Sequence, residues 1–231
     1  MNMPSTSNPV LEPCIDAAVA HYNAADYPAA LDIFHHLAER GDPVAPMWIG
    51  ACHAAGSGVP YSVAEAFAWY LKAAERGNAQ AQTNVGAMLI MGNGAEVDVP
   101  RGLYWLQRAA DAQDCGAQFN FASLYSVGEV VEQDHSRAFE WYLSAAKQGH
   151  YPSQARLGYC YQLGQGVNKD LVQAFVWLSL AARHGVGTAL IQLEQLMGQM
   201  SGDQKQQGAE LIDRWNAGSQ AAPERWQCVA V

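Results

Sequence analysis

The chain has 231 residues, of which 50% are hydrophobic and 15% are charged. This composition is sufficient for a packed core and too apolar for an intrinsically disordered chain. The formal net charge of −9 argues against nucleic acid and anionic membranes as partners, because both select basic protein surfaces. It is compatible with a protein partner, including a basic one.

The first residues indicate a flexible tail and no secretory signal. Residues 1–11 contain no basic residue and no apolar run, and they include Pro4 and Pro9. No segment approaches the roughly 20 apolar residues that a membrane-spanning helix needs. The five cysteines are widely spread and form no Cys-x-x-Cys pair, which is typical of reduced thiols in a cytosol. These features predict a cytoplasmic protein.

Helical patterning begins near Glu12, with one helix to Asn23 and a second from Tyr27 to Arg40. Gly41 follows the second helix, where a left-handed C-cap is expected. This pair has the spacing of the units that follow, but it lacks their glycines between the two helices. We therefore expect an atypical repeat that caps the array.

A unit of 36 residues then repeats along the chain. The four copies are residues 43–78, 79–114, 115–150 and 151–186. One tryptophan marks each copy: Trp69, Trp105, Trp141 and Trp177. Self-similarity at a period of this size predicts a solenoid, in which each repeat packs on its neighbours.

Each unit contains a helix A, a loop with glycine, and a helix B. Glycine in the loop allows the positive φ that a sharp reversal between helices needs. Helix B is expected to begin at a capping side chain, at Asp26, Ser62, Asp98, Asp134 and Asp170. Within helix B, Ala66, Trp69 and Ala73 share one face, which predicts that the four tryptophans are core residues.

After Val186 the repeat pattern fades. Thr188–Met200 and Asp203–Trp215 form one more helical pair, whose apolar face, including Leu190 and Leu196, would cover the last repeat. The expected organisation is a flexible tail at 1–11, a repeat solenoid at 12–186, capping helices at 187–215 and an irregular tail at 216–231.

The repeated unit resembles the Sel-1-like repeat, a 36-residue relative of the tetratricopeptide repeat. The copy at 151–186 carries the pattern through Gly158, Gly164-Gln-Gly166, Asp170, Ala174, Trp177, Ala181-Ala182 and Gly185. The resemblance implies an all-α, right-handed solenoid of about five repeats plus the capping pair. It also implies a scaffold for protein–protein contacts, usually in bacteria. A cysteine-rich branch linked to penicillin binding has paired cysteines within each repeat, which this chain lacks.

The sequence contains no recognisable catalytic constellation. The seven histidines form no His-Glu-x-x-His motif and no metal-binding spacing with cysteine. The Gly-x-Gly loops lack the third glycine of a dinucleotide-binding fingerprint and follow helices rather than strands. We therefore expect no enzyme activity, no cofactor and no metal.

The resemblance places helix A on the concave side of the solenoid, where the sequence varies from repeat to repeat. A binding groove there would be lined by Trp48, Asn84, Phe119, Asn120, Arg156 and Tyr159. Aromatic residues and arginine are the usual anchors of protein interfaces. The alternative is that Trp48 and Phe119 fill space between adjacent repeats.

Acidic residues are concentrated in the middle repeats. Glu96, Glu129 and Glu132 fall in loops between helices A and B, so they would share one edge. This edge is a second, less favoured candidate for partner binding. The alternative is a solvated edge with helix caps, a role that already explains Asp98 and Asp134.

The sequence thus favours a bacterial scaffold or adaptor that binds another protein through its concave helix-A surface. The alternative is an immunity protein that neutralises a secreted toxin through the groove or the acidic edge, with fast, salt-sensitive association.

Overall fold

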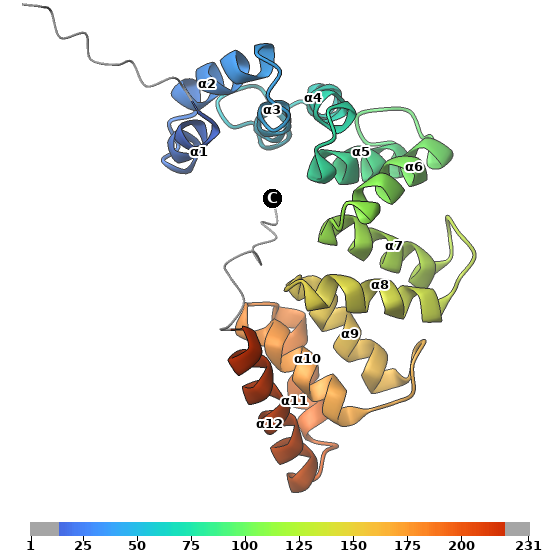
Figure 1. Cartoon of the computed structure of the whole chain (residues 1–231). Helices are drawn as coiled ribbons and strands as arrows, with labels where there is room; N and C mark the ends of the chain where they lie inside the picture. Colours follow the sequence, from blue (N-terminus) through green and yellow to red (C-terminus); the bar gives the residue numbers. More distant parts are fainter. Residues whose placement is uncertain (1–13, 220–231) are drawn as a thin grey trace, which may run out of the picture. The chain divides into compact units, whose positions relative to one another are not determined.

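The computed structural model describes residues 14–219 and is helical almost throughout (Figure 1). The helices are α1 (Ile15–Asn23), α2 (Tyr27–Glu39), α3 (Ala45–Ala55), α4 (Val63–Glu75), α5 (Ala79–Met91), α6 (Val99–Asp111), α7 (Cys115–Val127), α8 (His135–Lys147), α9 (Tyr151–Leu163), α10 (Leu171–Arg183), α11 (Gly187–Met197) and α12 (Gly202–Ser219). No strand occurs among these residues. The prediction of an all-α fold of helix–loop–helix repeats is confirmed.

The chain divides into two compact units, residues 1–97 and 98–231. We call their described parts the amino-terminal unit (α1–α5) and the carboxy-terminal unit (α6–α12). Within each unit, successive helices as far as α11 pack on one another, and α12 packs on α10. Helices α3, α5, α7 and α9 are the helices A of the repeats, and α4, α6, α8 and α10 are the helices B. Such nearest-neighbour packing is what a repeat architecture produces.

Side-chain caps fix most helix-B starts. Four of the five predicted caps form: Ser62, Asp98, Asp134 and Asp170. Asp26 precedes α2 but makes no cap bond. Its carboxylate is instead 2.9 Å from Nδ1 of His21, so the predicted cap at Asp26 is wrong because that histidine engages the carboxylate.

In each helix B, the large side chain that is buried in every repeat lies one residue after the tryptophan. Trp105 and Trp177 are buried, as predicted for core residues, whereas Trp69 and Trp141 are half-buried and pack against the core. The next residue is buried in all four repeats: Tyr70, Leu106, Tyr142 and Leu178. Tyr70 lies four residues after Ala66 and so stacks over it on the same helical face. Trp69 lies beside that face, where its ring packs edge-on against His35.

A glycine in helix A leaves space for the buried residue that follows the tryptophan in helix B. A Cβ at Gly50 would lie 2.7 Å from the Tyr70 ring, and one at Gly158 would lie 2.7 Å from Cγ of Leu178. These distances are shorter than van der Waals contact, so a side chain at either glycine would displace its neighbour. Gly50 and Gly158 therefore bring helices A and B close together in their repeats.

Buried glutamines join one repeat to the next. Nε2 of Gln82 donates to the carbonyl of Ala74 at 3.1 Å, and Nε2 of Gln154 donates to that of Ala146 at 3.2 Å. Each glutamine in helix A thereby satisfies a carbonyl of the preceding helix B. Gln118, at the same place in its repeat, accepts instead from Nε2 of Gln148 at 2.8 Å. This repeated glutamine position was not predicted from the sequence.

The carboxy-terminal pair closes the last repeat. Leu196 is buried, whereas Leu190 is exposed, so its assignment to the apolar packing face is wrong. α12 extends to Ser219, beyond the predicted helix end at Trp215. The remaining parts of the predicted tails, residues 1–11 and 220–231, lie outside the described residues.

The cysteines differ from the sequence-based expectation. Cys14, Cys52 and Cys160 have free thiols, but Cys115 is disulfide-bonded. Burial raises the pKa of Cys52 and of Cys160 to about 11, so both thiols are inert near neutral pH. The cysteines therefore no longer argue for a reducing compartment.

Candidate partner-binding surface

A hollow of about 310 Å³ lies on the helix-A side of the carboxy-terminal unit. Residues of α7, α9 and α11, with the residue before α11, line it: Phe119, Pro152, Ala155, Arg156, Tyr159, Val186, Thr188 and Gln192. Phe119, Arg156 and Tyr159 were predicted groove residues, and the structure brings these three together. We call this cavity the helix-A hollow.

Phe119 combines both roles that the sequence left open. Its ring centroid lies 5.8 Å from that of Tyr142 and 5.3 Å from that of His150, so one side packs into the repeat core. The half-buried side chain also lines the helix-A hollow. The core contacts hold the ring in one position, which prepares a fixed apolar wall before any partner arrives.

Arg156 is the one charged residue among those that line the helix-A hollow. Its side chain is exposed and forms no hydrogen bond or ion pair with another residue between 14 and 219. Its positive charge nevertheless affects the hydroxyl of the buried Tyr142. Burial raises the pKa of Tyr142, while the hydrogen bond between Tyr142 and Ser123 and the positive charge of Arg156 oppose this rise.

The other predicted groove residues lie apart from this hollow. Asn120 is half-buried on α7 but is not among the lining residues. Asn84 and Trp48 belong to the amino-terminal unit, and both are half-buried. The Trp48 ring stacks on Phe34 at 5.7 Å and contacts Tyr22 at 5.2 Å, as expected for a residue that fills space between repeats.

Five residues that line the hollow were not predicted from the sequence: Pro152, Ala155, Val186, Thr188 and Gln192. The signal was present, because Thr188 lies 36 residues after Pro152, and Gln192 lies 36 residues after Arg156. The fading of the core pattern after Val186 concealed it. The repeat spacing therefore extends into α11, both at these surface positions and at the buried Ala189, which lies 36 residues after the buried Ser153.

The predicted acidic residues are exposed, but they belong to different units. Glu96 lies in the amino-terminal unit, and Glu129 and Glu132 lie in the carboxy-terminal unit. Glu132 lines a second hollow of about 370 Å³, together with Tyr125, Val131, Gln133, Asp134 and Arg137. We call this cavity the loop hollow.

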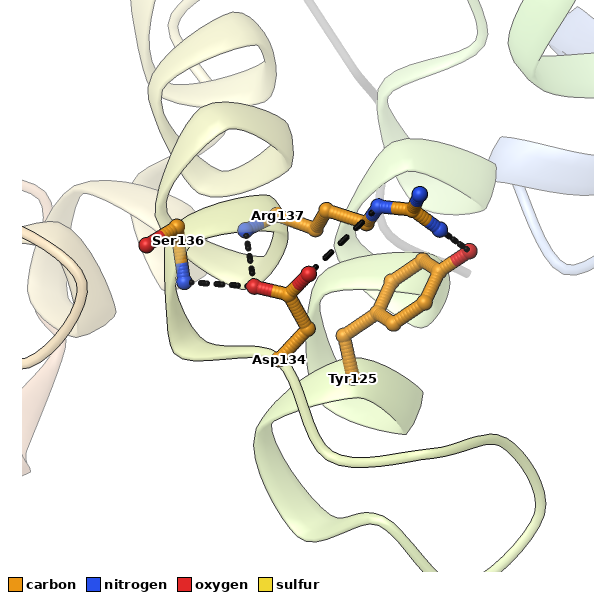
Figure 2. Close-up of polar contacts among 4 residues, drawn as sticks. All are labelled: Tyr125, Asp134, Ser136 and Arg137. Atoms are coloured by element: carbon orange, nitrogen blue, oxygen red, sulfur yellow. Dashed lines mark hydrogen bonds and ion pairs between the residues drawn. The ribbon is translucent and has the colours of Figure 1, made fainter.

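Two of the charged residues that line the loop hollow, Asp134 and Arg137, are paired with each other, as Figure 2 shows. Asp134 accepts hydrogen bonds from the backbone N–H groups of Ser136 and Arg137, both at 3.0 Å. Nε of Arg137 lies 3.4 Å from the Asp134 carboxylate, and its guanidinium donates to the Tyr125 hydroxyl at 3.4 Å. Asp134 is thus a helix cap with its own counter-ion, as the alternative interpretation of this edge expected.

Between residues 14 and 219, no group of three or more His, Cys, Asp or Glu side chains is arranged to hold a metal ion. None of the described helices combines the length and the apolar character needed to cross a membrane.

Solved structures with a similar fold come from several bacteria. A protective antigen of uropathogenic Escherichia coli strains, which has an SLR fold, is 28% identical with a TM-score of 0.79. The match covers 93% of this chain and 47% of that one, so this chain spans about half the length of the antigen. An immunity protein from Pseudomonas aeruginosa, Pa5087, is 21% identical, with a TM-score of 0.58 and coverage of 91% and 83%. No curated protein matches the chain.

The family assignment rests on the repeats themselves. The Sel1 repeat model matches residues 45–78, 79–114, 116–150 and 152–186, which is more than half of the chain. A Sel1 repeat protein from Oxalobacter formigenes is 30% identical, with a TM-score of 0.73, and the match covers 87% of this chain and 84% of that one. The chain belongs to the Sel1 repeat family.

Proposed function

We propose that this chain is a non-catalytic scaffold or adaptor that binds a partner protein through the helix-A hollow. Sel1 repeat proteins generally mediate protein–protein interaction. The observation that carries the proposal is the unpaired Arg156 beside Phe119 and Tyr159 in one cavity. Aromatic and arginine side chains that converge on a hollow are the usual anchors of an interface.

The helices that carry these residues support a preformed surface. Arg156 and Tyr159 lie on the same helix, α9, which packs on α8 and α10. Phe119 is held by its contacts with Tyr142 and His150. A partner would therefore meet side chains that are already in place, and binding would cost little additional ordering entropy.

Site-specific photo-crosslinking in the native cell tests the proposal. A benzophenone amino acid is placed at Thr188, which is exposed and lines the hollow, or at Glu140, which is exposed on α8 and does not. We expect one defined protein to crosslink at 188 and not at 140, with loss of the product when Tyr159→Ala is added. Identical products at both positions, or none at 188, would refute binding at the helix-A hollow.

The second candidate function is neutralisation of a toxin. Exposed Glu129 and the adjoining Glu132 favour it, because they give the loop side of the carboxy-terminal unit an acidic surface for a basic protein. The Pseudomonas protein of similar fold is an immunity protein. If this candidate is correct, the captured partner will be toxic when expressed alone and harmless with this chain. A Glu129→Lys/Glu132→Lys variant would then lose protection.

A further inference from the structure

We propose that the helix-A hollow recognises an acidic side chain, Asp or Glu, that lies next to an apolar residue in an extended segment of the partner. Arg156 is the ion-pair partner of that carboxylate. This inference rests on the proposed function and specifies the chemistry of the bound segment.

The charge of the hollow is opposite to that of the protein. The chain carries 22 acidic and 13 basic residues, yet no carboxylate lines this cavity and Arg156 does. An arginine presents a planar fork of N–H donors that matches a carboxylate with two parallel hydrogen bonds. A basic segment would gain nothing here and would be repelled by the guanidinium.

Arg137 provides a comparison within the same unit. Its guanidinium already contacts the Asp134 carboxylate and the Tyr125 hydroxyl (Figure 2). Arg156 has neither kind of contact among the described residues. The acidic surface of this protein therefore neutralises the arginine of the loop hollow and leaves that of the helix-A hollow available.

The remaining polar side chains in the hollow are also unpaired. The side chains of Tyr159, Thr188 and Gln192 form no hydrogen bond with any other residue between 14 and 219. Each can donate a hydrogen bond, and Thr188 and Gln192 lie on α11 while Tyr159 lies on α9. Donors from two helices around one cavity suit the carbonyl groups of an extended segment, whose backbone is not engaged in its own secondary structure.

Apolar residues complete the lining. Phe119, Pro152 and Val186 come from three different segments, and Ala155 between them is buried. The volume of about 310 Å³ admits side chains but not a folded element. An acidic residue with an aromatic or aliphatic neighbour would place its charge on Arg156 and its apolar neighbour against Phe119.

Peptide selection with the intact chain tests the inference. Random twelve-residue peptides displayed on phage are selected on immobilised wild-type protein, and the enriched sequences are synthesised with a fluorescent label. We expect an Asp or Glu beside an aromatic or aliphatic residue. Replacing that acidic residue by Gln, or Arg156 by Gln, should weaken binding about 10- to 100-fold, the range for a lost charge-assisted hydrogen bond.

Two variants sharpen the test. Arg156→Glu should reverse the preference, so that peptides with Lys at the acidic position bind more tightly than the original ones. Arg137→Gln removes another exposed arginine of the same unit and should leave peptide binding unchanged. Circular dichroism and urea unfolding establish that each variant is folded before its binding is measured.

The other possible outcomes distinguish failure of the acidic specificity from failure of partner binding at the helix-A hollow. Peptides without a preferred acidic residue that bind Arg156→Gln as well as wild type, yet fail to bind Tyr159→Ala, would overturn the acidic specificity and leave binding at the hollow intact. If no peptide is enriched, or if Tyr159→Ala binds every selected peptide normally, recognition of an extended segment by this hollow is wrong altogether.

Discussion

The close approach of helices A and B at Gly158 yields a quantitative prediction. In Gly158→Ala, the new Cβ would lie 2.7 Å from Cγ and 3.1 Å from the backbone nitrogen of Leu178. Leu178 is fully buried, so neither its side chain nor α10 can retreat without disturbing other contacts. Overpacking of this kind costs about 1–3 kcal/mol, and the backbone contact places it toward the upper end.

The better helix propensity of alanine opposes this cost. Replacing a glycine within a helix by alanine contributes about 1 kcal/mol. The net loss expected for Gly158→Ala is therefore about 1–2 kcal/mol in the free energy of unfolding. Urea unfolding followed by circular dichroism measures it.

Gly187 is the matched control, because it also lies in a helix of the carboxy-terminal unit. A Cβ at Gly187 would meet nothing within 4 Å, and its φ is not in the left-handed region. Gly187→Ala should therefore stabilise the protein, by about 0.4–1 kcal/mol. If Gly158→Ala is as stable as wild type, or shifts in the same direction as Gly187→Ala, the account of helix packing through glycine is refuted.

Three further predictions concern caps, buried amides and pH. Asp134→Ala should lower the free energy of unfolding in urea by about 1 kcal/mol, because it removes two hydrogen bonds that cap α8. Asp26→Ala removes no cap bond and should cost less, so equal losses would contradict the capping account. Gln154→Ala should cost about 2–4 kcal/mol in the same assay, because it leaves a cavity and removes the hydrogen-bond donor to the Ala146 carbonyl. A loss of less than about 1 kcal/mol would show that this hydrogen bond between repeats contributes little to stability. Burial lowers the pKa of His150 below 6.5, so the stability that this residue contributes is complete above about pH 6.5 and is lost as the pH falls through and below that value. The urea unfolding midpoints at about pH 7.5 and about pH 5.5 should therefore differ less in His150→Asn than in wild type. An unchanged difference would refute this assignment.

Local chemistry made the helix boundaries predictable from the sequence. An N-cap oxygen acts within three residues, and a glycine at a helix end acts through its own φ, so neither depends on the rest of the fold. Asp134 and Asp170 cap their helices as predicted, and Gly128 and Gly164 end α7 and α9 in the left-handed conformation. The exception, Asp26, fails because of a neighbour, His21, that the capping rule ignores.

Packing was less predictable, because one residue changes the direction of a helical side chain by about 100°. The repeated tryptophans drew attention to Trp69 and Trp141, whereas the neighbouring Tyr70 and Tyr142 occupy the buried positions. The small alanine side chains of helix B define its buried face only broadly, so the sequence is consistent with burial of either the tryptophan or the residue after it. The deciding contact is the one between Tyr70 and Gly50, which joins two helices and is invisible to the period of one helix alone.

The candidate site was predictable only in part, for a related reason. Sequence variation on helix A selected Phe119, Arg156 and Tyr159, which line one hollow, but also Trp48, whose ring stacks on Phe34. Variation identifies positions that the repeat core leaves free. It does not distinguish a side chain that a neighbouring repeat takes up from one that no neighbour reaches, because that depends on contacts between repeats.

The two arginine environments show how this repeat surface could acquire specificity. The charge of Arg137 at the start of α8 is neutralised locally, because Asp134, which caps this helix, is also its counter-ion. A charge in the middle of a helix A has no such built-in counter-ion, and Arg156 accordingly has none. A single substitution at that position therefore creates an unsatisfied charge without disturbing the core. We infer that selectivity for partners in this protein resides on the helix-A face, and that the loop edge contributes mainly to solubility and to helix stability.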